Sequence, residues 1–180
     1  MLYDCRDNQK HVLIVDDDQI IRLLMRESLE AAGFRVEEAE DGEQALALLI
    51  DSTPDLIMLD VMLPGIDGFE VCARVRDNPE RKDIPIVLVT GNNDLESIQR
   101  AYDMGVTDFI TKPIAWGSIA YRASFIIRAT TAFSDLKKSD KQLRHAQRIA
   151  KMGNWKLCLE SKKMWLSDEA LRICCMPPHY

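Results

Sequence analysis

A short apolar run that ends abruptly at an aspartate constrains the fold of this chain more than any other feature. In the stretch DLIMLDVMLPGIDG (55–68), the run 57–59 leads directly into Asp60, and a loop with one proline and two glycines follows. An apolar run of this length, bounded by residues that favour turns, is typical of a strand buried on both faces of a sheet. Asp60 would then lie at the carboxyl end of that strand, where ligands bind in open α/β sheets.

Similar apolar runs alternate with amphipathic stretches along the first 113 residues. Strict alternation of strands and helices predicts a parallel sheet with helices on both faces. The predicted fold class is therefore α/β, a doubly wound five-stranded parallel sheet, and the flavodoxin-like strand order 2-1-3-4-5 is one solution for it. We expect strands at 11–15, 34–39, 56–59, 85–89 and 108–111, and helices at 19–32, 42–51, 69–76, 95–104 and from 114 onward.

Four of the expected strands end in polar residues. Asp16 and Asp17 follow the first strand, Asp60 ends the third, and Thr90 and Lys112 follow the fourth and fifth. In the order 2-1-3-4-5 these ends open onto one crevice, where the carboxylates repel one another and favour a divalent cation such as Mg²⁺. A carboxylate nucleophile, a metal, a lysine and a hydroxyl are the groups that phosphoryl transfer requires. An isolated aspartate would more often be a helix cap, but Asp60 is not isolated.

The segments that carry these residues are LIVDDD (13–18), DLIMLDVMLPGIDG (55–68), VLVTG (87–91) and FITKPI (109–114). In this order and spacing they resemble the receiver domain of two-component response regulators. The resemblance covers about residues 10–130. It implies that the chain accepts a phosphoryl group on an aspartate from a histidine kinase or a phosphotransfer protein.

The resemblance assigns the phosphoacceptor and the metal ligands. The phosphoacceptor position matches Asp60. The bound metal would be Mg²⁺, held directly by Asp17 and Asp60 and by the backbone carbonyl of Met62. Asp16 would bind the same ion largely through water.

The resemblance also assigns the residues that contact and sense the phosphoryl group. Thr90 and Lys112 match the two contacting residues, and Phe109 matches the aromatic that switches together with Thr90. For Phe109 an ordinary place in the core is the alternative interpretation, because its position in a strand fits both. Asp18 is not needed in the acidic pair, and we expect it to cap a helix or to be solvated.

Composition narrows the class of protein further. Apolar residues make up 47% and charged residues 29% of the chain, as in globular proteins. No apolar run approaches the roughly 20 residues of a membrane span, and the N-terminus lacks the pattern of a signal peptide. The cysteines are odd in number, 5, without CxxC spacing, which favours reduced thiols over disulfides or a metal site. We therefore expect a cytoplasmic protein with no membrane partner.

The chain changes character after Pro113. Up to that residue there are 24 acidic and 11 basic residues, a balance of −13, whereas the remainder has 5 and 12, a balance of +7. We expect one helix from 114 to about 152, because no residue that stops a helix occurs before Gly153. Its basic side chains are more commonly a solvated face than a nucleic-acid surface, and no helix-turn-helix pattern follows. We therefore expect no nucleic-acid partner.

Heptad spacing along this helix suggests a coiled coil. The apolar matches are good in the middle of the helix and poor at both ends. We expect the chain to form a homodimer through this C-terminal helix. One set of heptad positions is Ile119, Ile126, Phe133, Asp140 and Gln147, and its partner set is Arg122, Ala129, Leu136, Leu143 and Ala150.

The tail after Gly153 has the pattern of a β-hairpin followed by a helix that starts at Ser167. Its GNW and WLSDE elements resemble the opening of a PAS sensory domain, particularly those that follow receivers in cyclic-di-GMP signalling proteins. A whole PAS fold needs on the order of 100 residues, so the chain would end inside that domain. The expected organisation is an N-terminal extension (1–10), a receiver domain (11–130), a helical coiled-coil linker (131–152) and a truncated PAS-like segment (153–180).

The predicted function is that of a phosphoacceptor receiver in two-component signal transduction. It would pass its state through a dimeric helix to an output domain absent from this chain, with cyclic-di-GMP turnover as one such output. It would not be an enzyme beyond its own phosphorylation and dephosphorylation. One alternative is a Mg²⁺-dependent aspartyl-phosphate hydrolase, but Met62 stands where such enzymes usually carry a second aspartate. The other is a non-phosphorylated pseudo-receiver that only binds partners, against which the intact set of polar residues argues.

Overall fold

The chain divides into two compact units, residues 1–130 and 131–180. The structure, a computed structural model, describes residues 9–91, 99 and 102–176. Among the described residues, every helix is too short or too polar to pass through a bilayer.

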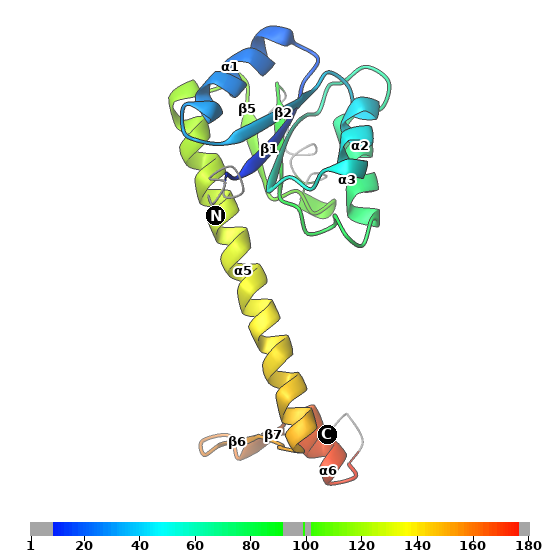
Figure 1. Cartoon of the computed structure of the whole chain (residues 1–180). Helices are drawn as coiled ribbons and strands as arrows, with labels where there is room; N and C mark the ends of the chain where they lie inside the picture. The colour runs from blue at the N-terminus through cyan, green and yellow to red at the C-terminus, as the bar shows by residue number, and fades with distance from the viewer. Residues whose placement is uncertain (1–8, 92–98, 100–101, 177–180) are drawn as a thin grey trace, which may run out of the picture. The chain divides into compact units, whose positions relative to one another are not determined.

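The first unit is built around a parallel sheet of five strands (Figure 1). The strand order is β2-β1-β3-β4-β5, which confirms the predicted order. Every residue of β1, β3 and β4 is buried, as expected for apolar strands that have helices on both faces. The strands are β1 (His11–Val15), β2 (Arg35–Ala39), β3 (Leu56–Asp60), β4 (Ile86–Thr90) and β5 (Asp108–Thr111).

Helices cover both faces of this sheet. Buried side chains of α2 and α3 pack with Leu13 and Val15 on one face, and those of α1 and α5 pack with Val12 and Ile14 on the other. Alternate residues of β1 thus serve two separate cores, which is the period-two geometry of a strand. The helices are α1 (Gln19–Glu30), α2 (Gly42–Asp51), α3 (Gly68–Asp77) and α5 (Trp116–Ala150). The predicted helix at 95–104 lies largely outside the described residues.

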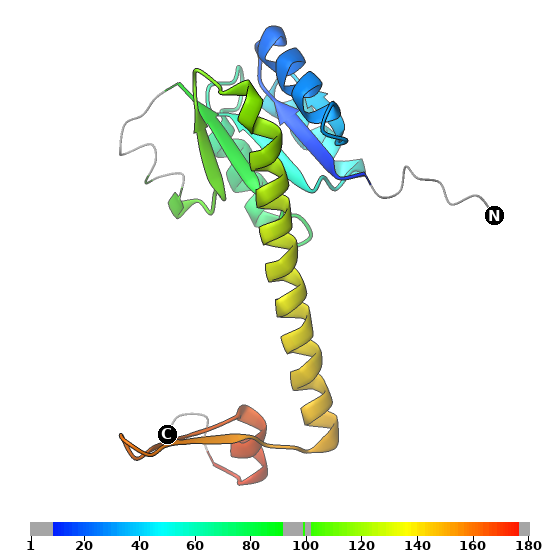
Figure 2. The same cartoon turned by 90° about the vertical axis from the view of Figure 1, so that its left-hand side faces the viewer.

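The second unit contains the later part of α5, a hairpin and a short helix. The hairpin strands β6 (Trp155–Cys158) and β7 (Lys163–Leu166) are antiparallel and lie side by side in Figure 2. Helix α6 (Asp168–Ile173) follows, and the Ser167 hydroxyl accepts a hydrogen bond from the amide of Ala170 at 3.2 Å, which caps it. These elements match the expected hairpin and capped helix, while the resemblance to a PAS domain stays a prediction.

The heptad pattern along α5 covers two different environments. Ile119 and Ile126 are buried in the core of the first unit, packed beneath the sheet. Phe133, Leu136 and Leu143 are exposed to solvent. The first two apolar positions of the predicted coiled coil are therefore occupied by contacts within the chain, and only the later ones are free to meet another surface.

Candidate functional site

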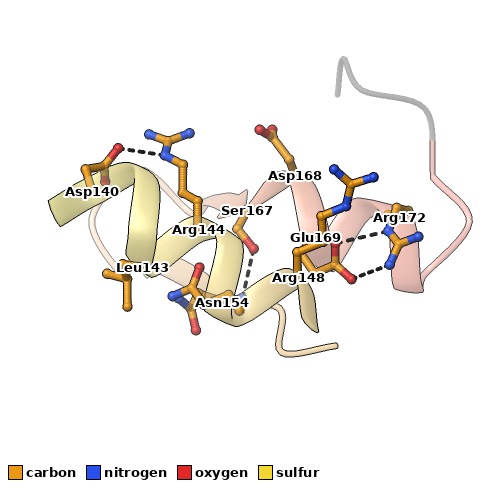
Figure 3. A pocket seen from close by; sticks show the side chains of 10 residues that line it. Asp140, Leu143, Arg144, Arg148, Asn154, Ser167, Asp168, Glu169 and Arg172 are labelled. Carbon is orange, nitrogen blue, oxygen red and sulfur yellow. Dashed lines mark hydrogen bonds and ion pairs between the residues drawn. The ribbon is translucent and has the colours of Figure 1, made fainter. Parts of the chain in front are cut away.

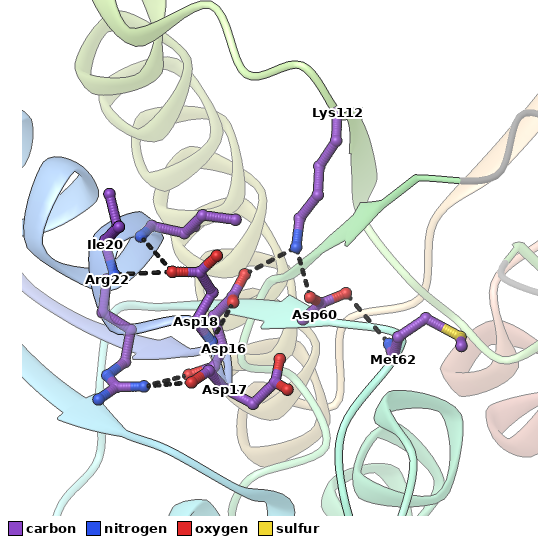
Figure 4. Close-up of polar contacts among 9 residues, drawn as sticks. Asp16, Asp17, Asp18, Ile20, Arg22, Asp60, Met62 and Lys112 are labelled. Carbon is purple, nitrogen blue, oxygen red and sulfur yellow. Dashed lines mark hydrogen bonds and ion pairs between the residues drawn. The ribbon is translucent and has the colours of Figure 1, made fainter.

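Three strand ends bring two aspartates and a lysine into direct contact. The Nζ atom of Lys112 lies 3.1 Å from Oδ2 of Asp16 and 2.5 Å from Oδ2 of Asp60 (Figure 4). Both carboxylates are buried, and Asp60 is only 3% exposed. They come from β1 and β3, neighbours in the sheet, whereas Lys112 follows β5. The sequence prediction that these strand ends meet is correct for these three residues.

A third carboxylate, that of Asp17, completes an acidic cluster. One oxygen from each of Asp16, Asp17 and Asp60 lies within 4.8 Å of the others. Asp17 is exposed, so the cluster is open to solvent on that side. A donor set made only of carboxylate oxygens, with room for water, fits a hard divalent cation of the Mg²⁺ type.

Burial and charge shift the protonation of this cluster. The pKa of Asp16 is raised to about 6, mainly because burial disfavours the charged carboxylate. The hydrogen bond from the Asp18 amide lowers this pKa, whereas the nearby charge of Asp60 raises it. Burial by itself would lower the pKa of Lys112. The hydrogen bonds and charges of Asp60 and Asp16 outweigh that effect, so its pKa is raised and the lysine is cationic. The lysine therefore offsets part of the negative charge of the cluster.

Helix α1 anchors the acidic loop through its capping residue. The backbone amide of Asp18 donates to Oδ1 of Asp16 at 3.0 Å. The side chain of Asp18 in turn accepts from the amides of Ile20 and Ile21 at 2.8 and 3.3 Å, which confirms it as the N-cap of α1. Sequence reasoning found this cap.

Arg22 was not identified from the sequence as part of this site. The guanidinium of Arg22 reaches back from α1, and its Nη1 donates to the carbonyl oxygens of Asp16 at 2.7 Å and Asp17 at 3.1 Å. The only signal in the sequence is an arginine in the first turns of the helix after an acidic pair, which by itself does not distinguish this contact from a solvated side chain.

The loop after β3 holds Asp60 from the other side. The backbone amide of Met62 donates to Oδ1 of Asp60 at 3.1 Å, which places Met62 beside the cluster. The proposed role of the Met62 carbonyl as a metal ligand stays a prediction. A Cβ atom at Gly68 would lie 2.2 Å from the carbonyl oxygen of Asp60, so only glycine fits there.

Thr90 and Phe109 lie on the two strands beyond β3. Asp60 pairs with Val89 across β3 and β4, so Thr90 is one residue further along at the same edge of the sheet, where it is buried. The ring of Phe109 packs edge-on against Tyr102, with centroids 6.2 Å apart and an interplanar angle of 88°. Phe109 is half-buried against the core cluster that includes α3. Its role as a switch stays a prediction.

A separate pocket lies within the second unit (Figure 3). Its charged side chains are largely paired with one another: Arg144 with Asp140 at 2.7 Å, and Arg172 with both carboxylate oxygens of Glu169 at 2.7 and 3.0 Å. Most of the lining residues are exposed. Paired charges in contact with water contribute little binding energy, and we assign no function to this pocket.

Comparison with known proteins supports the assignment of the first unit. The family model described as the response regulator receiver domain matches residues 12–123. The DNA-binding dual master transcriptional regulator RpaA of Synechocystis sp. is 37% identical over 132 residues, which are 73% of this chain and 55% of that protein. The chain thus spans about half the length of the curated relatives it matches.

Solved structures give the same result. A putative response regulator from Chloroflexus aurantiacus has a TM-score of 0.64 and 35% identity, with 67% of this chain and 99% of that chain covered. The phosphorylated cyanobacterial phytochrome response regulator RcpA has a TM-score of 0.58 and 31% identity, with 66% and 91% covered. The family model spans well over half of the chain, and its limits coincide with the sheet and site described above. This chain belongs to the response regulator receiver domain family.

Proposed function

We propose that the chain accepts a phosphoryl group on Asp60 from a histidine kinase or a phosphotransfer protein. The observation that carries this proposal is the buried Asp60 carboxylate, 2.5 Å from the Lys112 ammonium and within 4.8 Å of two further carboxylates. A nucleophilic oxygen next to a fixed positive charge and a cluster of oxygen ligands is the arrangement that phosphoryl transfer needs, because that reaction depends mainly on positioning and charge neutralisation.

The residues of the site divide the chemistry among them. A carboxylate oxygen of Asp60 attacks phosphorus, the bond to the donor's leaving group breaks, and an aspartyl phosphate results. Lys112 pairs with a phosphoryl oxygen, and the Thr90 hydroxyl donates to another. Mg²⁺, held by Asp17, Asp60, the Met62 carbonyl and, through water, Asp16, would neutralise charge on the phosphoryl oxygens.

Incubation with acetyl phosphate and Mg²⁺, followed by intact-protein mass spectrometry, tests this proposal. The wild type should gain one phosphoryl group, and Asp60→Asn should gain none. Asp77→Asn, a change of the same kind at an exposed position of α3, should label like the wild type. Equal labelling of wild type and Asp60→Asn would refute the assignment of Asp60.

We further propose that phosphorylation moves Thr90 toward the phosphoryl oxygens and lets Phe109 change its packing. The contact between Phe109 and Tyr102 supports this, because it connects β5 to the segment that precedes it. Beryllofluoride, standing in for the phosphoryl group, should then shift NMR signals of Phe109 and Tyr102 as well as those at Asp60. Shifts confined to the loops that touch the ligand would make Phe109 an ordinary core residue.

For the second unit we propose a homodimer through α5, which transmits the receiver state in the cytoplasm to an output module of PAS-linked, cyclic-di-GMP type. Three exposed apolar side chains at heptad positions support it: Phe133, Leu136 and Leu143. Light scattering after size exclusion should report a dimer that Phe133→Glu with Leu136→Glu converts to a monomer. Ser134→Glu with Gln142→Glu adds the same charge outside the apolar positions and should stay dimeric. A wild-type monomer at high concentration would defeat the proposal.

A further inference from the structure

The side chain of Arg22 makes a contact with the acidic loop that none of the roles above uses. Its Nη1 donates to the carbonyl oxygen of Asp16 and to that of Asp17, and Figure 4 shows both bonds converging on one end of the guanidinium. The side chain is only 12% exposed. Its Nε also lies 3.8 Å from a carboxylate oxygen of Glu38 on β2, which holds the guanidinium against the sheet. Arg22 is therefore fixed at both ends.

The two carbonyls belong to the peptide groups on either side of the Asp17 Cα atom. A peptide group is planar, so a hydrogen bond to its carbonyl oxygen restrains the tilt of the whole plane. With both planes held, the backbone dihedral angles of Asp17 are held as well, and with them the direction of its Cα–Cβ bond. Arg22 thus restrains the backbone from which the Asp17 side chain projects.

Asp17 depends on this restraint more than its neighbour does. The carboxylate of Asp16 is held by the Asp18 amide at 3.0 Å and by Lys112 at 3.1 Å. The carboxylate of Asp17 is exposed and has no hydrogen bond to any residue that the structure describes. Among the described residues, the hydrogen bonds that restrain Asp17 are therefore those to its backbone.

We propose that Arg22 is a positioning residue that holds Asp17 ready for the divalent cation. This inference rests on the proposed function, in which Asp17 is a direct ligand. Removal of the two donors should weaken cation binding because the Asp17 carboxylate then samples many directions and must be ordered when the ion binds.

Neighbouring residues on α1 provide matched variants. Arg22→Met keeps the apolar stem and removes every donor, whereas Arg22→Lys keeps the charge but loses the planar fork. Arg26→Met is the control, because Arg26 also pairs with Glu38, at 3.1 Å, yet has no hydrogen bond to the loop carbonyls. It removes an ion pair to the same carboxylate and leaves the loop untouched.

Titration with Mn²⁺, followed by the electron paramagnetic resonance of the free ion, measures binding directly, and competition with Mg²⁺ extends the measurement to that ion. The dissociation constant of Arg22→Met should rise about 10-fold, the usual scale for loss of a residue that orients a metal ligand. Arg22→Lys should fall between that variant and the wild type, and Arg26→Met should match the wild type. Phosphorylation of Arg22→Met by acetyl phosphate should need more Mg²⁺ for half its maximal rate, with the rate at saturating Mg²⁺ nearly unchanged.

Several outcomes would overturn the inference. Wild-type affinity in Arg22→Met would do so, and so would an equal loss in Arg26→Met, since the Glu38 ion pair would then be the cause. If Arg22→Met does not fold, Arg22→Gln decides instead, because its shorter side chain cannot reach both carbonyls, and wild-type affinity in that variant refutes the role. Failure of the wild type itself to bind Mn²⁺ and to label at Asp60 would instead refute the proposed function.

Discussion

The two units of this chain differ in the burial of their apolar side chains. In the first unit the strands β1, β3 and β4 are buried along their whole length, with a core on each face of the sheet. In the second, every residue of 131–146 is exposed, and so are both tryptophans of the hairpin. A two-stranded hairpin by itself is at best marginally stable in water. The first unit thus buries a core of its own, whereas the described residues of the second leave most of their large apolar side chains exposed.

Truncation of an apolar side chain should change the free energy of unfolding very differently in the two units. Ile57→Ala removes a fully buried side chain from β3 and should lower the free energy of unfolding by about 2–5 kcal/mol. Leu136→Ala removes a side chain that is 68% exposed and should change it by no more than about 0.5 kcal/mol in the monomer. Urea unfolding followed by circular dichroism measures both. A large loss for Leu136→Ala at low concentration would show that the second unit has a core of its own.

Glycine substitutions should show how tightly the site in the first unit is packed. Gly68→Ala forces its new methyl group onto the Asp60 carbonyl and should cost about 1–3 kcal/mol, as overpacking does. It should also slow the proposed phosphorylation, because the displaced backbone carries Asp60. Gly117→Ala, at a position in α5 with nothing within 4 Å of the new Cβ, should be neutral or stabilising by about 0.5 kcal/mol. Thermal melting and acetyl phosphate labelling of the two variants make the comparison.

Helix caps offer a comparison of smaller size. Asp41 caps α2 through the Gln44 amide at 2.7 Å, and Asp41→Ala should destabilise the first unit by about 1 kcal/mol. Ser167→Ala removes the cap of α6 and should leave the unfolding transition of the first unit unchanged. Amide hydrogen exchange should report its effect only around α6. A shift of the whole transition by Ser167→Ala would mean that the two units unfold together.

A buried histidine should give the first unit a weak dependence on pH. The pKa of His11 lies below its ordinary 6.5, mainly because of burial, and the charge of Arg35 lowers it further. The charges of Glu37 and Asp55 raise this pKa but do not outweigh the other two effects. Below pH 6.5 the histidine is protonated more readily in the unfolded chain than in the folded protein. The free energy of unfolding should therefore fall as the pH drops from about 7 towards 5. His11→Gln should flatten this slope in urea titrations. An unchanged slope would assign the pH dependence to the carboxylates instead.

The sequence was most informative where a side chain directly follows a buried strand. Asp60 and Lys112 could be placed together because the apolar runs before them define the strands, and a parallel sheet gathers its carboxyl ends at one edge. The contact of Arg22 could not be predicted in this way. It depends on the rotamer of a long side chain that reaches back to a residue six positions earlier. Ile126 was wrongly assigned to the helix face through which two chains would meet. Heptad spacing shows which residues share a helix face but not which surface that face contacts, and Ile126 is buried in the core of the first unit. The strand order required the resemblance or the structure, because several orders are compatible with simple alternation.

The ion pairs of Lys112 also bear on synthesis at the ribosome. This lysine joins Asp60 across 52 positions and Asp16 across 96, so both contacts are remote in sequence. The nascent chain emerges with its N-terminus first, and contacts of this kind form only once both partners have left the exit tunnel. A partly translated chain therefore presents Asp60 before Lys112 is available to pair with it. The lysine-paired arrangement of this site is therefore complete only after most of the first unit has been made.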